Sequence, residues 1–87
     1  MQPPSDQIIS VKAFLEILNE TLTFAFPAVT VEGEVSSFKV NQGKWIFFDL
    51  KDEDATLPCF MPKFQLKVTL EDGMKVRVTG VPKITNW

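Results

Sequence analysis

The fold is decided by residues 31–61, which read VEGEVSSFKVNQGKWIFFDLKDEDATLPCFM. Apolar and polar residues alternate over residues 29–36, and this period of two is typical of a strand with one buried face. Residues 41–43, Asn-Gln-Gly, then predict a turn. The apolar and aromatic run over residues 45–50 predicts a strand in the centre of a sheet.

Two further strands are expected downstream. The acidic residues 52–54 predict a second turn, followed by a third strand over residues 56–61. Residues 62–70 combine a proline with alternating apolar residues, and we interpret them as an irregular or short helical connection. Residues 71–73, Glu-Asp-Gly, predict a turn into a fourth strand over residues 74–79. In the first strand, Gly33 indicates a bulge or a sharp bend, because glycine offers no side chain to pack.

The composition fits one small domain. The chain has 87 residues, of which 45% are hydrophobic and 23% charged, so a second domain is not expected. Neither an apolar run long enough to span a membrane nor a signal peptide is present, which predicts a cytoplasmic protein without a membrane partner. Cys59 is the single cysteine and there is no histidine, so we expect a buried thiol, no catalytic residue, no metal and no cofactor.

Charge is distributed unevenly along the chain. The net charge is -2, but residues 1–38 hold one base and five acids, whereas residues 39–87 hold eight bases and six acids. Because screening limits charge effects to about 10 Å, a local basic stripe can bind phosphates on an acidic protein. The later part of the chain is therefore where we expect an anionic ligand.

Several blocks, taken in order, resemble a known family. They are a short helix, the pair Phe26-Pro27, VEGEVSSF at residues 31–38, GKWIFFDLKDEDATLPCFM at residues 43–61 and GMKVRVTG at residues 73–80. This order resembles the start of the large subunit of bacterial exodeoxyribonuclease VII, over roughly residues 10 to 80. The resemblance implies a mainly β fold, an OB-like antiparallel barrel of five strands with an N-terminal helix.

The resemblance also implies a function. It indicates a domain over residues 10–87 that holds single-stranded DNA. Residues 1–9 contain two prolines and mixed polar residues, which predict a poorly ordered leader. Cutting residues would lie further along an exodeoxyribonuclease, which works with small subunits, so this stretch is not itself an enzyme. No fifth strand is expected after Gly80. We therefore expect a fragment of a longer protein whose third and fourth strands have open edges and invite self-association.

The predicted helix begins at Ser10, a suitable N-cap, and ends near residues 24–25 before Pro27. Its apolar face consists of Val11, Phe14, Leu15, Leu18 and Leu22. In a small barrel such a helix plugs one end. The alternative is that its apolar face docks another subunit.

The candidate ligand-binding residues are rings for base stacking and cations for phosphates. They are Phe38, Trp45, Phe47 and Phe60, together with Lys39, Lys44, Lys51, Lys63 and Arg77. Strand parity assigns Ile46, Phe48, Leu50, Leu57, Cys59 and Met61 to the core, and Trp45, Phe47, Asp49, Thr56 and Phe60 to the opposite face. The alternatives are that Trp45 closes the barrel end and that the lysines are merely solvated.

An acidic cluster is the remaining feature. Asp49, Asp52, Glu53 and Asp54 lack the spacing of an EF-hand, so we interpret them as a solvated turn instead of a metal site. Besides DNA binding, a protein-docking module remains as a second hypothesis. Single-stranded RNA or transfer RNA is a third, because RNA bases offer the same faces for stacking.

Overall fold

A computed structural model describes residues 8–85, and the chain divides into two compact units. One unit combines Met1–Val29 with Thr79–Trp87, and the other is Thr30–Val78. The predicted leader, residues 1–9, falls largely outside the described residues.

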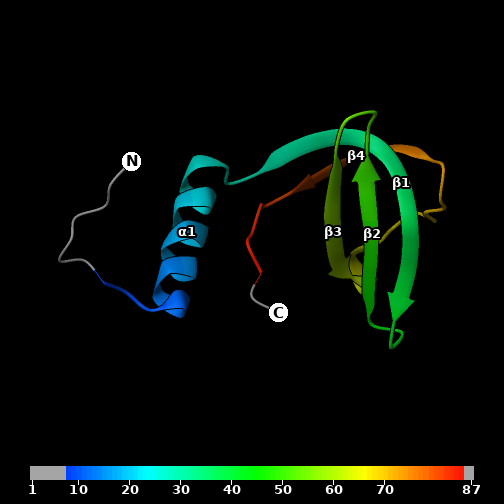
Figure 1. Ribbon diagram of the computed structural model, residues 1–87. Coiled ribbons are helices and arrows are strands. Elements are labelled where there is room, and N and C mark those ends of the chain that lie inside the picture. Colours follow the sequence, from blue (N-terminus) through cyan, green and yellow to red (C-terminus); the bar gives the residue numbers. More distant parts are fainter. Residues whose placement is uncertain (1–7, 86–87) are drawn as a thin grey trace. The chain divides into compact units, whose positions relative to one another are not determined.

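The first unit contains the helix α1, Val11–Ala25 (Figure 1). Ser10 caps it, since its hydroxyl oxygen accepts a hydrogen bond of 3.0 Å from the Ala13 N–H, which confirms the predicted start. The side chain of Asn19 holds the segment after the last strand. Its Nδ2 donates to the Ile84 carbonyl at 2.9 Å, and its Oδ1 accepts from the Ile84 N–H at 2.7 Å. The predicted plugging of a barrel by α1 stays a prediction.

The second unit is built on a four-stranded sheet with the order β3-β2-β1-β4 (Figure 1). The elements are β1 Val29–Asn41, β2 Trp45–Lys51, β3 Thr56–Pro62, the short 3-10 helix η1 Lys63–Gln65, and β4 Lys75–Gly80. β2 pairs antiparallel with both β1 and β3. The predicted fold class, mainly β with an N-terminal helix, is confirmed as a half-barrel, and residues 81–85 form no strand.

Both predicted hairpin turns form, each for an identifiable reason. Gln42 and Gly43 have φ of 54° and 66°, and the Lys44 N–H donates to the Asn41 carbonyl at 3.1 Å. Two successive positive φ angles give the turn that matches the twist of a hairpin. At the other end of β2, the Asp52 carboxylate accepts from the N–H groups of Asp54 and Ala55 at 2.8 and 2.9 Å. Asp52 is thus a turn-forming residue.

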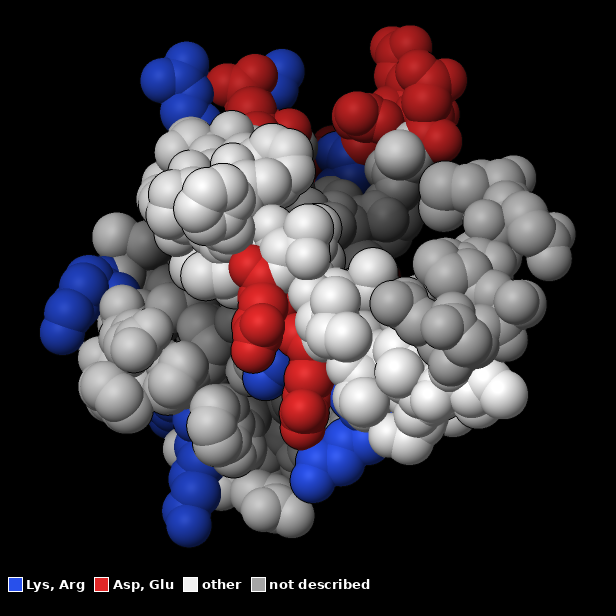
Figure 2. All heavy atoms as spheres, turned by 90° about the vertical axis from the view of Figure 1, so that its left-hand side faces the viewer, with Lys and Arg blue, Asp and Glu red and all other residues white. Residues whose placement is uncertain are grey.

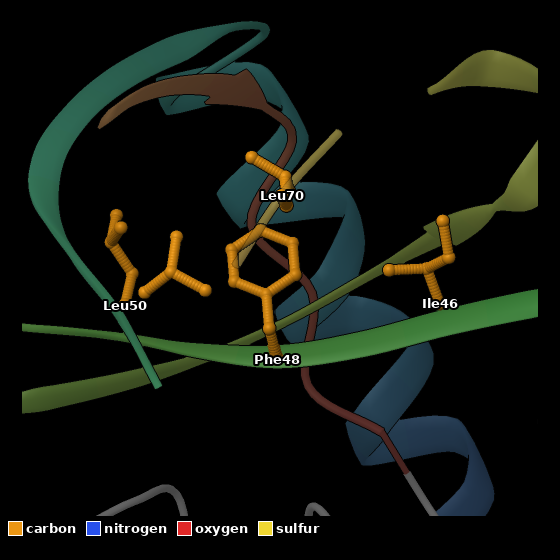
Figure 3. Packing of buried hydrophobic residues seen from close by; sticks show 5 residues of the cluster. Ile46, Phe48, Leu50 and Leu70 are labelled. Carbon is orange, nitrogen blue, oxygen red and sulfur yellow. The ribbon is translucent and has the colours of Figure 1, made fainter. Parts of the chain in front are cut away.

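The hydrophobic core lies on one side of the sheet. Val35, Ile46, Phe48 and Leu50 are buried, and Leu70, from the connection before β4, belongs to the same buried cluster (Figure 3). Other side chains that pack against this cluster are Val31, Phe38, Cys59, Met61, Leu66, Val76 and Val78. The parity predicted for β2 is confirmed, and on β3 Cys59 and Met61 pack against the core as predicted. Leu57, also predicted in the core, is instead 47% exposed, because it lies on an edge strand of the sheet. Leu70 was not predicted in the core, because its place in an irregular segment gives no parity.

Gly33 is required for close approach. A Cβ there would lie 2.8 Å from Leu50 Cγ and 2.9 Å from the Lys51 carbonyl oxygen. The break in the β1–β2 register lies further along, between Ser36 and Lys39, where Ser37 has φ of 54°. The predicted bulge of this strand therefore exists, but it lies at Ser37 and not at Gly33.

Candidate nucleic-acid interface

The bulge in β1 decides which side chains share a face. Ser36 pairs with Asp49, and the next matched pair is Lys39 with Phe47, so β1 has one residue more than β2 over this stretch. After the extra residue, the two faces of β1 exchange. Lys39 therefore joins the face opposite the core, whereas an unbroken strand would place it on the core side with Val35.

The face opposite the core, called here the outer face, forms rows across three strands. One row is Lys39, Phe47 and Phe60, and the next is Asn41, Trp45 and Pro62. The third and fourth rows are Ser36, Asp49 and Pro58, followed by Glu34, Lys51 and Thr56. The predicted ring residues of β2 and β3 thus lie on adjacent rows at one end of the sheet.

Three rings on the outer face form an aromatic patch, defined as Trp45, Phe47 and Phe60. The ring centroids of Phe47 and Phe60 are 6.1 Å apart with planes at 22°, and those of Trp45 and Phe60 are 6.3 Å apart at 51°. Trp45 is 41% exposed and Phe60 47% exposed. The three rings pack against one another, and Trp45 and Phe60 keep part of their surface exposed for stacking.

Three lysines accompany the aromatic patch. Lys39 is level with Phe47, Lys44 precedes Trp45, and Lys63 follows β3. The Lys63 N–H donates to the Lys44 carbonyl at 2.8 Å, so the backbones of these two lysines are joined. Within residues 8–85, the three lysines form no ion pair. Their charges are therefore available to an external anion.

The other predicted cations are engaged by carboxylates. Lys51 Nζ lies 3.6 Å from Glu34 Oε2. Arg77 Nε lies 3.2 Å from Glu32 Oε1, and Lys75 Nζ lies 4.0 Å from Glu32 Oε2. The end of the sheet away from the aromatic patch is thus partly neutralised within the protein.

Phe38 does not join the aromatic patch. Its side chain is partly buried against the core cluster, and its N–H donates to Asp72 Oδ1 at 2.9 Å. The bulge at Ser37 is the physical reason, because it turns Phe38 to the core side as it turns Lys39 outward.

Sequence reasoning missed Phe64. This residue lies in η1 and is 77% exposed. Together with Trp45, Lys44 and Lys63 it lines an open depression of about 570 Å³ where β2 begins and β3 ends. The sequence does contain a signal for it, because Phe64 is an aromatic residue directly after the candidate cation Lys63. The segment lacks the alternation of a strand, so the face on which Phe64 lies could not be predicted.

Two titratable groups in this unit have shifted pKa values. Burial raises the pKa of the Cys59 thiol, and the charge of Asp49 adds to that effect, so the thiol is protonated at neutral pH and is a poor nucleophile. The two backbone N–H groups at Asp52 lower the pKa of its carboxyl. These hydrogen bonds show that Asp52, the first acid of the cluster at residues 52–54, forms part of a turn.

The charges on α1 differ from those beside the aromatic patch. The helix carries one base, Lys12, and two acids, Glu16 and Glu20. Figure 2 shows a short row of acidic side chains on a largely uncharged surface over α1. Phosphates are repelled there, so the sheet is the better candidate interface.

Among residues 8–85, no helix has both the length and the apolar character needed to cross a membrane.

The chain is similar to exodeoxyribonuclease 7 large subunits of several bacteria. The exodeoxyribonuclease 7 large subunit of Campylobacter hominis is 36% identical over 77 residues, which cover 83% of this chain and 20% of that protein. The same subunit of Salinibacter ruber is 36% identical over 76 residues, covering 84% and 19%. That of Natranaerobius thermophilus is 43% identical over 56 residues, covering 61% and 13%. The chain thus spans a fifth or less of the length of these relatives.

These matches confirm the resemblance to exodeoxyribonuclease large subunits. A family model described as OB-fold nucleic acid binding domain matches residues 9–86, which is nearly the whole chain. The match agrees with the half-barrel and with the aromatic and basic residues on its outer face. The chain therefore belongs to the family of OB-fold nucleic acid binding domains.

Proposed function

We propose that this chain binds single-stranded DNA on the aromatic patch and its three lysines. The observation that carries the proposal is the row Lys39, Phe47 and Phe60, in which a lysine without an ion pair among residues 8–85 is level with two contacting rings. Single-strand binders combine rings for stacking with cations that follow the phosphates. Both requirements are met on one face of one sheet.

Binding would proceed without recognition of a particular sequence. Every base has a flat face, and stacking on a protein ring contributes about 1–3 kcal/mol per base. Trp45, Phe47 and Phe60 would hold neighbouring bases, while Lys39, Lys44 and Lys63 neutralise phosphates. Duplex DNA hides the faces of its bases within the stack, so a single strand is the form that this surface suits.

The wider role follows from the relatives. Those proteins are named exodeoxyribonuclease 7 large subunits, and this chain is similar to a part of them. In our proposal residues 10–87 are the DNA-binding domain of such a subunit, acting in the cytoplasm, where bacterial DNA lies. The strand is held here and cut by residues elsewhere in the subunit, which works with small subunits.

The test is an anisotropy titration of a labelled oligothymidine of about 16 nucleotides, the upper end of OB-fold site sizes. Phe60→Ala should weaken binding at least about fivefold, corresponding to about 1 kcal/mol. Phe14→Ala is the matched control, because Phe14 on α1 is 50% exposed and Phe60 47%. Equal affinities of the two variants would refute the role of the aromatic patch.

The same titration separates the other candidates. DNA binding must weaken steeply as salt rises, whereas docking of an apolar protein surface is nearly indifferent to salt. An oligouridine of equal length tests RNA. If it binds more tightly than oligothymidine, RNA replaces DNA as the proposed ligand.

A further inference from the structure

An open depression adjoins the aromatic patch where β2 begins and β3 ends. Its volume is about 570 Å³, within the range of roughly 300–1,000 Å³ found for small-ligand sites. The residues that line it are Gly43, Lys44, Trp45, Pro62, Lys63 and Phe64. Two rings and two cations thus surround one space on the sheet unit.

The backbone explains why these residues meet. Trp45 pairs with Pro62 across the strands, and the Lys63 N–H donates to the Lys44 carbonyl at 2.8 Å. These contacts fix the β1–β2 turn beside η1. The Leu66 N–H then donates to the Lys63 carbonyl at 3.1 Å, closing a single 3-10 turn that presents Phe64. The two lysines are therefore held side by side in the backbone.

The exposure of Phe64 has no structural explanation in the sheet unit. Its side chain is 77% exposed, although burying a phenylalanine contributes about 1.5–3 kcal/mol. Among residues 8–85, its ring makes no contact with another aromatic ring, so the space between Phe64 and Trp45 is open. A ligand with a flat ring would cover this exposed surface.

The charge in the depression defines the ligand further. Lys44 and Lys63 have no carboxylate partner among the described residues. A purely apolar partner would leave both ammonium groups desolvated and unpaired, which is costly. A nucleotide supplies an anion and a flat ring a short distance apart, and so matches both features.

We infer that the depression is a subsite for one nucleotide of the bound strand, next to the bases on the aromatic patch. The base stacks on Phe64, and its phosphate lies between the ammonium groups of Lys44 and Lys63. Trp45 belongs to both surfaces and makes them continuous. This inference rests on the proposed function and adds one position to the strand path, formed by the β3–β4 connection.

The experiment compares Phe64→Ala with Phe24→Ala, a control on α1 whose ring is 91% exposed. Affinity is measured by anisotropy for oligothymidines of increasing length. Phe64→Ala should bind the longer oligonucleotides about fivefold more weakly or worse, and Phe64→Trp should restore binding. Lys63→Gln should lower the slope of log affinity against log salt by about 0.7, the value for one phosphate contact with a single strand.

The outcomes separate the subsite from the proposed function. If Phe60→Ala weakens binding while Phe64→Ala matches Phe24→Ala, the subsite is refuted and the aromatic patch stands. If the unmodified chain binds no oligothymidine at low salt, both the subsite and the proposed function are refuted. If polyglutamate competes as well as oligothymidine, the subsite is also refuted, because a carboxylate chain has no ring to stack.

A loss of folding would be recognised separately. A thermal melt of each variant by circular dichroism checks that the sheet is intact. If Phe64→Ala melts early, Phe64→Leu decides, because leucine keeps an apolar side chain at this exposed position but offers no ring for stacking. An affinity of Phe64→Leu for the longer oligonucleotides equal to that of the unmodified chain then refutes the subsite.

Discussion

Replacing Glu32 by glutamine should steepen the salt dependence of DNA binding. Glu32 holds two cations of the outer face, Arg77 at 3.2 Å and Lys75 at 4.0 Å. A DNA strand that extends beyond the aromatic patch must compete with the Glu32 carboxylate for Arg77 and Lys75. The glutamine side chain keeps the size of the glutamate but carries no charge, so it releases them.

The magnitude follows from the number of released cations. Each phosphate contact adds about 0.7 to the slope of log affinity against log salt for a single strand. Glu32→Gln frees two cations and should steepen the slope by up to about 1.4. Glu34→Gln frees Lys51 alone and should add up to about 0.7. Since exposed ion pairs contribute only about 0.2–1 kcal/mol each, the fold should tolerate both changes.

The assay is the oligothymidine titration repeated over a series of salt concentrations. Glu20→Gln on α1 makes the same change in net charge outside the sheet and corrects for the overall field of the protein. A slope for Glu32→Gln equal to that of Glu20→Gln would refute the reasoning. It would mean that the strand never reaches Arg77 and Lys75.

Three further predictions concern stability and association. Gly33→Ala should lower the free energy of unfolding by roughly 1–3 kcal/mol in urea titrations, because the new Cβ would lie 2.9 Å from the Lys51 carbonyl oxygen. An unchanged free energy of unfolding would contradict this close approach. Hydrogen bonds lower the Asp52 pKa below its ordinary 3.8, so this stabilisation is present above pH 3.8 and is lost as pH falls through the lowered value. Asp52→Ala should therefore reduce urea stability above that pH, with a difference from the unmodified chain that shrinks in acid; a difference independent of pH would count against it. Finally, β3 and β4 are the edges of the sheet, so sedimentation velocity should show self-association as concentration rises, whereas a monomer with a sharp cooperative melt would argue against it.

Parity made the core of the sheet predictable. Ile46, Phe48 and Leu50 form the wholly apolar face of one strand, and burial follows from that alternation. A bulge that interrupts the alternation cannot be predicted from the sequence in the same way. Ser37 looks like any polar strand residue, yet its positive φ moves Lys39 to the aromatic patch and Phe38 to the core.

Side-chain neighbours that depend on tertiary contacts were the hardest to predict. The ion pairs of Arg77 and Lys51 depend on which glutamates of β1 lie opposite, and register alone settles that. Phe64 lies in a 3-10 turn, where neither a period of two nor a helical period applies. Its position beside Trp45 follows from the pairing of β2 with β3, which is a tertiary contact.

Quenching of Trp45 fluorescence tests the central claim most directly. The sequence has two tryptophans, and Trp87→Phe leaves Trp45 as the only one, so the signal reports the aromatic patch. On titration with oligothymidine, we predict quenching that saturates at low salt and weakens at moderate salt. A cooperatively folded Trp87→Phe variant whose fluorescence is unchanged at both salts would contradict stacking of single-stranded DNA on this face.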